Sequence, residues 1–426
     1  MALNYIWAAF FLIAFLVAVF KAFLASYFGL ETDPEIFNKI MESIFGRAKL
    51  GFELSLYLTG VLALWMGIMK IGERSGMVEK LAWLVRPFFR KIFPQVPPEH
   101  PANGAMMMNF SANMLGLDNA ATPLGLEAMK ELQTLNPKKD TASDAQIMFL
   151  VLNTSGLTLV PVSILALRAA HHSANPTDVF VPILLATFAS TLVGLLVTMY
   201  IQLKNPVRWL RWLFSPVTLI YIGLALLAIL GLSWYLHGKT QEEITQFTGL
   251  LSNGLLLGII ILFIAVGLLS KINVYDAFID GAKGGFDVAV TIIPYLVAML
   301  TAIGAFTASG AMDFVLGGLR DFFGLFFSDV RFVDGLPTAF LKPLTGGGAR
   351  AAMIDSWEVY GVDSFVGHLT SVLQGSTETT FYVLAVYFGS VGIKKVRYAV
   401  WAGLAADLAG IIAAIIITYV FFGHLA

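Results

Sequence analysis

Hydrophobic residues along the chain fall into runs long enough to cross a membrane, and short polar segments separate these runs. About 20 consecutive apolar residues span the hydrocarbon of a bilayer as an α-helix. The stretches that reach this length are 5–24, 52–71, 180–203, 216–236, 250–269, 286–306 and 399–422. The pattern predicts an all-α polytopic membrane protein.

Two further apolar stretches carry a polar motif in the middle. The stretch 145–168 contains Asn153-Thr154-Ser155, and the stretch 364–391 contains Gln374-Gly375-Ser376-Thr377-Glu378-Thr379. Polar groups at membrane depth need partners from the protein or from a water-filled cavity. We therefore expect both stretches to be broken helices that unwind at the motif and line a polar site.

The chain also repeats itself. A set of residues recurs in the second half in the same order and at a constant offset: Ala48, Lys49, Gly51, Phe52, Leu62, Ser75 and Gly76 match Ala282, Lys283, Gly285, Phe286, Leu296, Ser309 and Gly310. The two polar motifs align with each other at a slightly shorter offset, which pairs Asn153 with Gln374. Secondary transporters are often built from such repeats, with the binding site between them. We expect a first repeat over 1–204, a linker with an unpaired transmembrane helix over 205–249, and a second repeat over 250–426.

Each half holds a segment rich in Gly, Asn, Thr and Pro that is too broken for an ordinary span. These segments are 103–132 and 342–360. Irregular backbone at membrane depth is tolerated where protein or a cavity surrounds it. We therefore expect each segment to be a re-entrant helical hairpin, which enters and leaves on the same side. Two amphipathic stretches, 35–47 and 274–283, are expected to lie along the membrane surface.

Loop charges indicate how the two halves are oriented. Basic residues dominate the loop 76–98, whereas aspartates outnumber arginines in the matching loop 310–335. The positive-inside rule places the first loop in the cytoplasm and the second on the opposite face. The repeats are therefore expected to have inverted topology. The expected location is the cell inner (cytoplasmic) membrane, with the N-terminus inside and the C-terminus outside.

Composition narrows the possible functions. Hydrophobic residues make up 58% of the chain, charged residues make up 13%, and the mean hydropathy is +0.78. Charged residues alone make up about 25% of a typical soluble domain. The net charge of −1 predicts no nucleic-acid surface. Since cysteine is absent, the histidines are scattered and no nucleotide-binding or nucleophile motif occurs, we expect no enzyme, no metal site and no cofactor besides a coupling Na⁺ or H⁺.

Polar residues of both halves form the predicted substrate site. An acid at the depth of Glu378 costs about 2.5–3.5 kcal/mol, so Glu378 either faces a substrate or ion, or pairs with Arg350 or Lys342. Arg350 in turn either grips a carboxylate or phosphate, or neutralises Glu378. Free N–H groups at the hairpin tips suit an anionic or polar group. The candidate substrate-binding residues are Asn113, Asn119, Thr122, Asn153, Thr154, Ser155, Thr345, Gly346, Gly347, Arg350, Gln374, Ser376, Thr377, Glu378 and Thr379.

Three carboxylates in apolar surroundings are the candidates for ion coupling: Glu378, Asp118 and Asp407. Asp118 lies at the tip of the first hairpin, where the alternative is that Asn and Asp side chains merely cap the hairpin. Asp407 either joins a proton path or pairs with a lysine of the loop that holds Lys394. The neutral motif 153–155 has its own alternative, which is hydrogen bonding between helices.

Longer motifs carry a resemblance to a known family. The first half, with Asn113-Met114-Leu115-Gly116-Leu117 and Ala120-Ala121-Thr122-Pro123-Leu124-Gly125, resembles the spore maturation protein A family. The second half, with Ile293-Pro294-Tyr295-Leu296-Val297-Ala298-Met299 and the stretch 374–381, resembles the spore maturation protein B family. Both families belong to the nucleoside-recognition, or gate domain, superfamily, which also contains concentrative nucleoside transporters. The resemblance covers nearly the whole chain and implies a fusion of the two proteins with a hairpin-containing, inverted-repeat transporter fold, without implying a nucleoside as the substrate.

We therefore expect a secondary active transporter that moves a small polar or anionic solute by alternating access, coupled to Na⁺ or H⁺. Its expected partners are the solute, membrane lipid and, as an option, further copies of the chain in a homo-oligomer. The alternative is a non-transporting membrane scaffold or assembly factor for envelope or spore maturation. Polar residues at membrane depth and short loops favour transport over the scaffold.

Overall fold

The computed structural model describes residues 2–114, 118–216, 218–220, 223, 227, 231, 235 and 241–425. Over these residues the chain is built from helices, and the β-type pairing found there is an isolated bridge between Thr141 and Lys395. The expectation of an all-helical chain with several apolar helices is confirmed. Such a chain is a polytopic membrane protein.

The helices come in two series that follow the same order. The first series is α1 (Ala2–Val19), α2 (Ile36–Arg74), α3 (Met77–Ile92), α4 (Pro101–Met114), α5 (Asp118–Leu135), α6 (Asp144–Ser155), α7 (Val162–Ala170) and α8 (Phe180–Leu203). The second is α11 (Gln241–Leu269), α12 (Val274–Ala308), α13 (Ala311–Gly324), α14 (Leu336–Leu341), α15 (Gly346–Tyr360), α16 (Phe365–Gly375), α17 (Thr380–Ser390) and α18 (Ala399–Phe422). The shorter elements are η1 (Phe20–Leu24), η2 (Ala25–Phe28), α9 (Pro206–Leu213) and η3 (Arg331–Gly335).

Helix starts repeat between the series as well. The Ser143 hydroxyl caps α6 by accepting a hydrogen bond from the backbone N–H of Gln146, and the Ser364 hydroxyl caps α16 by accepting one from the N–H of Gly367. A serine at this position satisfies an N–H group that has no partner within the helix. The offset that aligns the two polar motifs also pairs Ser143 with Ser364.

Several helices have the length and composition of membrane spans. Within the described residues, the segments Trp7–Phe28, Ile36–Arg74, Phe180–Leu203 and Ala399–Phe422 qualify, and α12 and α13 form a pair bent by 71°. The predicted spans 180–203 and 399–422 coincide with α8 and α18. Most of the predicted span 216–236 lies outside the described residues. The stretches 35–47 and 274–283 are not separate surface helices. They form the first turns of α2 and α12, whose helical backbone continues through Arg74 and Ala308 and, in α12, past Pro294.

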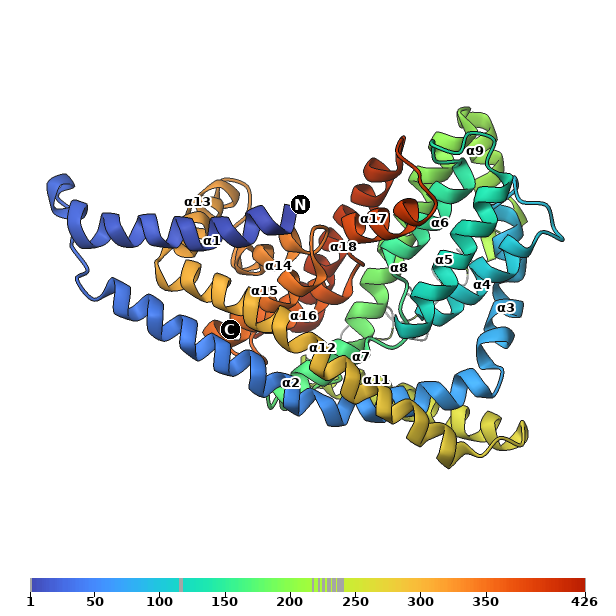
Figure 1. Ribbon diagram of the computed structural model, residues 1–426, viewed down its shortest axis with the longest axis horizontal. Helices are drawn as coiled ribbons and strands as arrows, with labels where there is room; N and C mark the ends of the chain where they lie inside the picture. Colours follow the sequence, from blue (N-terminus) through green and yellow to red (C-terminus); the bar gives the residue numbers. More distant parts are fainter. Residues whose placement is uncertain are drawn as a thin grey trace.

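The long helices α2 and α12 pack side by side through glycines (Figure 1). A Cβ atom on Gly51 would lie 3.2 Å from the Val297 backbone nitrogen, and one on Gly285 would lie 2.5 Å from the Ala63 nitrogen. The offset of the repeat pairs Gly51 with Gly285 and Ala63 with Val297. The two contacts therefore mirror each other. The later position on α2 contacts the earlier position on α12, so the two helices run antiparallel.

Helices α8 and α18 form a second mirrored pair. A Cβ atom on Gly194 would lie 3.1 Å from the Ala406 Cβ, and one on Gly410 would lie 3.2 Å from the Ser190 Cβ. The Ser190 hydroxyl also donates a hydrogen bond to the Ala406 carbonyl at 2.9 Å. This pair too is antiparallel, and it brings the last helix of each series together.

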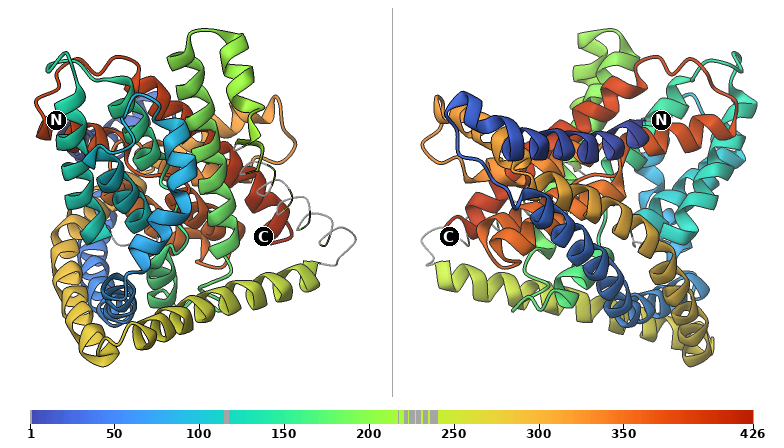
Figure 2. Two further views of the ribbon diagram at one scale, coloured as in Figure 1. Left: turned by 90° about the vertical axis from the view of Figure 1, so that its right-hand side faces the viewer. Right: turned by 60° about the vertical axis from the view of Figure 1, so that its left-hand side comes forward.

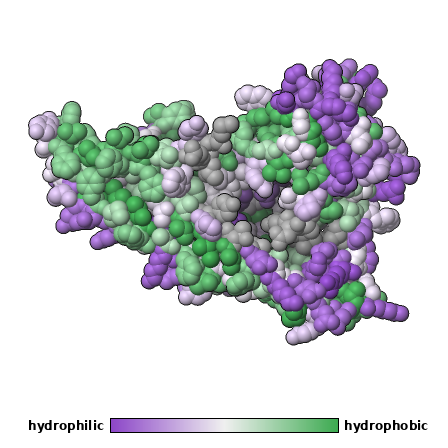
Figure 3. Space-filling model, in the orientation of Figure 1, coloured by the Kyte–Doolittle hydropathy of each residue, from purple (hydrophilic) through white to green (hydrophobic). Residues whose placement is uncertain are grey.

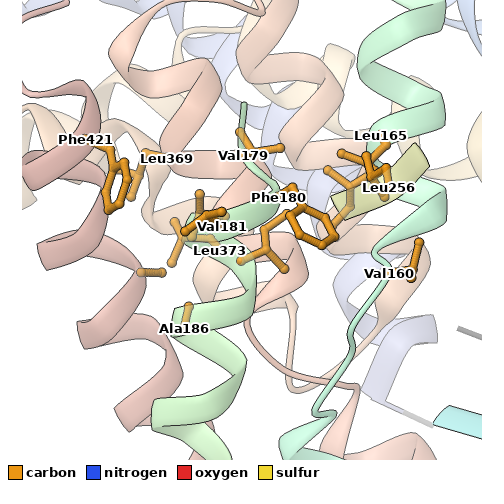
Figure 4. Packing of buried hydrophobic residues seen from close by; sticks show 14 of the residues in the cluster. Val160, Leu165, Val179, Phe180, Val181, Ala186, Leu256, Leu369, Leu373 and Phe421 are labelled. Carbon is orange, nitrogen blue, oxygen red and sulfur yellow. The ribbon is translucent and has the colours of Figure 1, made fainter. Parts of the chain in front are cut away.

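Buried hydrophobic residues from both series share the same cores. One cluster joins Val160, Leu165 and Phe180 of the first series to Leu373 and Phe421 of the second (Figure 4). The two halves therefore fold onto each other rather than forming separate bodies. Within a bilayer such packing stabilises the fold mainly through van der Waals contacts between helices.

The outline of the molecule separates an apolar arm from a polar end. Helices α1, α2 and α12 form the arm (Figure 1), and α11 contacts the end of α2 and runs away from it across the bottom of the molecule (Figure 2). Hydrophobic residues cover the arm, and hydrophilic residues gather at the opposite end (Figure 3).

Candidate functional site

The two broken helices meet at their breaks. Helix α6 ends at Ser155 and α7 begins at Val162, while α16 ends at Gly375 and α17 begins at Thr380. The backbone N–H of Glu378 donates a hydrogen bond of 2.8 Å to the Thr154 carbonyl. Each unwound segment thus lies against the other, at the point where the polar motifs predicted a break.

Gly156 makes this crossing possible. Its φ of 58° lies in the left-handed region, which glycine adopts without strain. A Cβ atom at this position would lie 2.9 Å from the Glu378 Cγ and 3.2 Å from the Glu378 backbone nitrogen. Both the local turn and the close approach of the second half therefore require glycine here.

A cavity of about 260 Å³ opens beside the crossing. Both halves line it, with residues from the helix pairs α4–α5 and α14–α15 and from the two broken helices. Of the predicted site residues, those that line it are Asn113, Thr122, Asn153, Gly346, Arg350, Gln374, Thr377 and Glu378. The structure therefore brings together side chains that are distant in the sequence, from Asn113 in the first half to Glu378 in the second.

Charged groups lie on the part of the wall that the second half supplies. Lys342 follows α14 and is 5% exposed, and Arg350 is a half-buried residue of the first turns of α15. Glu378 comes from the break between α16 and α17 and is exposed. All three residues line the cavity. Lys342 also lies within electrostatic range of Asp407.

A hydrogen-bonded amide cluster lies on the part supplied by the first half. The Asn153 Oδ1 atom accepts hydrogen bonds from Asn113 Nδ2 at 2.8 Å and from the Tyr387 hydroxyl at 3.1 Å. The Asn153 Nδ2 atom donates to the Phe149 carbonyl at 2.9 Å. Asn109 Nδ2 holds the other side of the cluster through the Ala121 carbonyl at 2.7 Å. The predicted alternative of interhelical hydrogen bonding therefore describes Asn153, which also faces the cavity.

Several predicted residues support the site from behind its wall. The Ser155 and Ser376 hydroxyls donate to the Leu152 and Leu373 carbonyls of their own helices. The Thr345 hydroxyl caps α15 by accepting a hydrogen bond from the N–H of Gly348 at 3.2 Å. The predicted residues that do not line the cavity are Thr154, Ser155, Thr345, Gly347, Ser376 and Thr379.

The predicted ion-coupling carboxylates are placed differently. The side chains of Asp118 and Asn119 lie outside the part of the chain that the structure describes. Asp407 is 1% exposed, and its Oδ2 atom accepts a hydrogen bond of 2.6 Å from the Thr380 hydroxyl at the start of α17. Thr380 is therefore the hydrogen-bond partner of Asp407, whereas the predicted alternative was a lysine of the loop that holds Lys394.

Tyr387 and Tyr382 line the cavity and were not foreseen. A Cβ atom on Gly125 would lie 2.2 Å from the Tyr387 hydroxyl oxygen, so the glycine lets α5 approach α17. Tyrosines in an apolar stretch give no periodic signal that separates a site residue from a packing residue. The pairing of Gly125 with Tyr387 is visible only once the chain is folded.

At one end of the molecule, a buried cluster joins the loop after α7 to the start of α16. We name it the buried clamp; its members are Arg168, Ser173, Asp178, Asp363 and His368. Arg168 is fully buried and contacts Asp178 and Asp363 at 3.1 Å each. The His368 Nε2 atom lies 2.9 Å from Asp178 Oδ2.

Asp363 shows how tightly the buried clamp is held. Burial raises the pKa of this carboxyl, but hydrogen bonds from the Ala174 amide and the Ser173 hydroxyl, with the charge of Arg168, lower it further, so the pKa lies below its ordinary value. The Ala174 amide donates to Asp363 Oδ2 at 2.8 Å. The carboxylate is therefore held in its charged form.

A second cluster joins the loop before α6 to the loop before α18. We name it the exposed clamp; its members are Asp140, Ala142, Asp144, Lys395 and Arg397. The Ala142 amide donates to the Lys395 carbonyl at 3.0 Å, and Arg397 Nη1 lies 2.8 Å from Asp144 Oδ1. The offset between the polar motifs pairs Ala142 with Asp363, and Ala174 with Lys395. The two clamps are therefore formed by equivalent loops of the two halves.

Comparison with known proteins places the chain in a family. The family described as Gate, nucleoside recognition, matches residues 55–170 and 289–394, together half of the chain. The chain belongs to this nucleoside-recognition family. Each matched part of the chain contains one of the helix pairs α4–α5 and α14–α15 and one broken helix.

Two curated relatives each match part of the chain. Spore maturation protein A of Bacillus subtilis (strain 168) is 41% identical over 166 residues, which cover 39% of this chain and 85% of that protein. Spore maturation protein B of the same organism is 47% identical over 157 residues, which cover 37% of this chain and 86% of that protein. The Gate chain is thus consistent with a fusion of proteins of these two kinds. No solved structure gives a significant match.

Proposed function

We propose that this chain is a secondary active transporter of a small polar or anionic solute, driven by Na⁺ or H⁺ through alternating access. The observation that carries the proposal is the cavity at the crossing of the two breaks, which hairpin and helix residues of both halves line. Transporters place their solute sites at such interrupted helices, between repeated halves. In this proposal the protein is not an enzyme.

The proposal includes inverted repeats, with re-entrant hairpins at α4–α5 and α14–α15. Inversion is supported by the mirrored antiparallel contacts of α2 with α12 and of α8 with α18. The positions of the clamps support it too, because equivalent loops meet in reciprocal pairs. The proposed location is the cell inner membrane, with the N-terminus inside. The first repeat is proposed to end at residue 204 and the second to begin at residue 250.

Alternating access assigns the two clamps to the two gates. The buried clamp holds the loop after α7 against the loop before α16, and the exposed clamp holds the loop before α6 against the loop after α17. Opening one clamp while the other stays closed would expose the cavity to one side at a time. Glu378 is the proposed coupling carboxylate, with Asp118 and Asp407 as further candidates.

Uptake into proteoliposomes tests the proposal. The purified protein is reconstituted, a Na⁺ or H⁺ gradient is imposed, and uptake is measured for nucleosides, amino acids and organic acids. We expect gradient-driven uptake that is lost in the double variant Glu378→Gln, Arg350→Ala. The control pair Glu127→Gln, Arg211→Ala, on exposed residues outside the cavity, should retain it. Uptake that survives the first pair would contradict the site.

The alternative function is a membrane scaffold or assembly factor, and the printed names of the relatives refer to spore maturation. A scaffold would move no solute under either gradient. It would also keep its partners when the cavity charges are removed, because the cavity would have no role. Absence of uptake together with retained partner association would favour this alternative.

A further inference from the structure

Charges of opposite sign line different parts of the cavity. The basic groups Lys342 and Arg350 flank the tip of the second hairpin, directly after α14 and in the first turns of α15. The acidic group Glu378 stands on the break between α16 and α17, where its backbone N–H is fixed by the Thr154 carbonyl. A site with separated opposite charges best complements a solute that also carries both charges.

Gln374 adds an acceptor that needs a donor. This side chain is 5% exposed, lines the cavity, and its buried Oε1 atom accepts no hydrogen bond from any described residue. A buried acceptor without a partner costs about 1–3 kcal/mol. A solute that brings an N–H group next to Gln374 would remove this cost, and a carboxylate alone would not.

The side-chain oxygen of Asn153 is already satisfied by the protein. Its Oδ1 atom accepts from Asn113 and Tyr387, which fills both lone pairs of an amide oxygen, and its Nδ2 donates to Phe149. The first half therefore positions the wall of the cavity, whereas discrimination falls to charged and unsatisfied groups of the second half.

We propose that the solute is a zwitterion with a carboxylate and an amine, such as an amino acid or a very short peptide. Its carboxylate faces Arg350 and Lys342, and its ammonium group faces Glu378 and the Oε1 atom of Gln374. A volume of about 260 Å³ admits such a molecule. This inference rests on the proposed function of the cavity as a solute site.

Matched ligands test the requirement for both charges. The probes are a set of L- and D-amino acids and alanyl-alanine, each compared with its N-acetyl and its amide derivative, with uridine and succinate as non-zwitterionic probes. Binding to the purified full-length protein is measured as thermal stabilisation, since a ligand that binds the folded state raises the unfolding temperature. We expect at least one zwitterion to bind the protein, and we expect each of its blocked derivatives to bind the protein with an affinity about tenfold or more lower.

Variants assign the two ends of the solute. In Arg350→Ala, the preference for the free acid over the amide derivative should fall, because only Lys342 still faces the carboxylate, whereas the preference for a free amine should persist. In Glu378→Gln, the N-acetyl derivative should bind as well as the free amine, whereas the preference for a free carboxylate should persist. A variant that merely misfolds would lose both preferences, and size-exclusion profiles identify it. If one variant misfolds, the other variant and the ligand preferences of the wild-type protein still test the inference.

The outcomes separate the inference from the proposed function. Binding of a zwitterion without gradient-driven uptake would sustain the inference and contradict transport. Uptake of succinate, uridine or an N-acetyl derivative as efficient as that of any free amino acid would sustain transport and overturn the inference. Absence of stabilisation by every zwitterion at millimolar concentration would also overturn the inference.

Discussion

The two clamps occupy equivalent positions in the two halves, yet their burial differs sharply. The contrast lies in the cations: Arg168 of the buried clamp is fully buried and contacts two carboxylates, whereas the Lys395 and Arg397 side chains of the exposed clamp are 72% and 35% exposed. Breaking a buried ion pair costs far more than breaking an exposed one, because the remaining charge loses its partner away from water. Corresponding loop positions therefore meet in both clamps, but through contacts of different strength. In a transporter with two gates, the exposed clamp would open first.

Removing Arg168 should have the largest effect on stability. Arg168→Ala leaves Asp178 and Asp363 without their shared cation, and we expect a loss of about 3–5 kcal/mol in unfolding free energy. Thermal or denaturant unfolding in detergent measures it. An effect no larger than that of Arg397→Ala would show that the clamps do not differ in strength.

Acid should weaken the end that holds the buried clamp. Burial, with the charges of His172 and Arg47, lowers the pKa of His171 from 6.5 to about 4, despite Glu358 at 3.6 Å. The pKa of His171 is lower in the folded state than in the unfolded state, so the neutral imidazole favours the folded state. The contribution of His171 to the free energy of unfolding is complete above pH 6.5 and declines as the pH falls towards 4. The decline amounts to about 3 kcal/mol at most.

Replacing the histidine checks this pH dependence. His171→Gln should flatten the profile of unfolding temperature between pH 6.5 and 4. His172→Gln, at its exposed neighbour, should change the profile less, because the charge of His172 lowers the pKa of His171 less than burial does. An unaltered profile in His171→Gln would assign the acid sensitivity elsewhere.

The crossing between the clamps depends on Gly156. Gly156→Ala combines a positive φ with a clash against Glu378, and we expect a loss of about 1–3 kcal/mol. Gly60→Ala is the control, because an added Cβ at Gly60 meets nothing within 4 Å and sits inside helix α2. Equal stability of the two variants would mean that the breaks do not touch as described.

The smallest effect is expected at the exposed clamp. Arg397→Ala removes a partly exposed pair with Asp144 and a hydrogen bond to the Ala142 carbonyl, and should cost about 1 kcal/mol or less. The loss should shrink further at high salt, since exposed pairs are screened. A cost comparable with that of Arg168→Ala would remove the contrast between the clamps.

Much of the fold followed from local signals in the sequence. The spans 180–203 and 399–422 are uninterrupted apolar runs, and the break at Gly375 follows from consecutive polar residues inside such a run. The stretches 35–47 and 274–283 were misassigned because their amphipathic pattern resembles that of a surface helix. In the structure, no break separates them from the apolar parts of α2 and α12.

The candidate site was only partly accessible to sequence reasoning. Glu378, Arg350 and Gln374 stand out because charge and amide groups are costly in an apolar run. Tyr387 did not, since an aromatic residue is ordinary there. Arg168 did carry a signal, as a lone cation ending the stretch 145–168, but its partners Asp178 and Asp363 lie in loops, where acids are common. Their convergence is a property of the tertiary fold.

The most direct test of alternating access uses the absence of cysteine from the chain. Ser163 lines the cavity, so Ser163→Cys introduces a single thiol at the proposed solute site. A membrane-impermeant maleimide is applied to inside-out and to right-side-out vesicles, and the labelling rate is measured for each. The account predicts labelling from both sides, with the ratio of the two rates shifted by a Na⁺ or H⁺ gradient. Labelling from one side only, unchanged by either gradient, would contradict it.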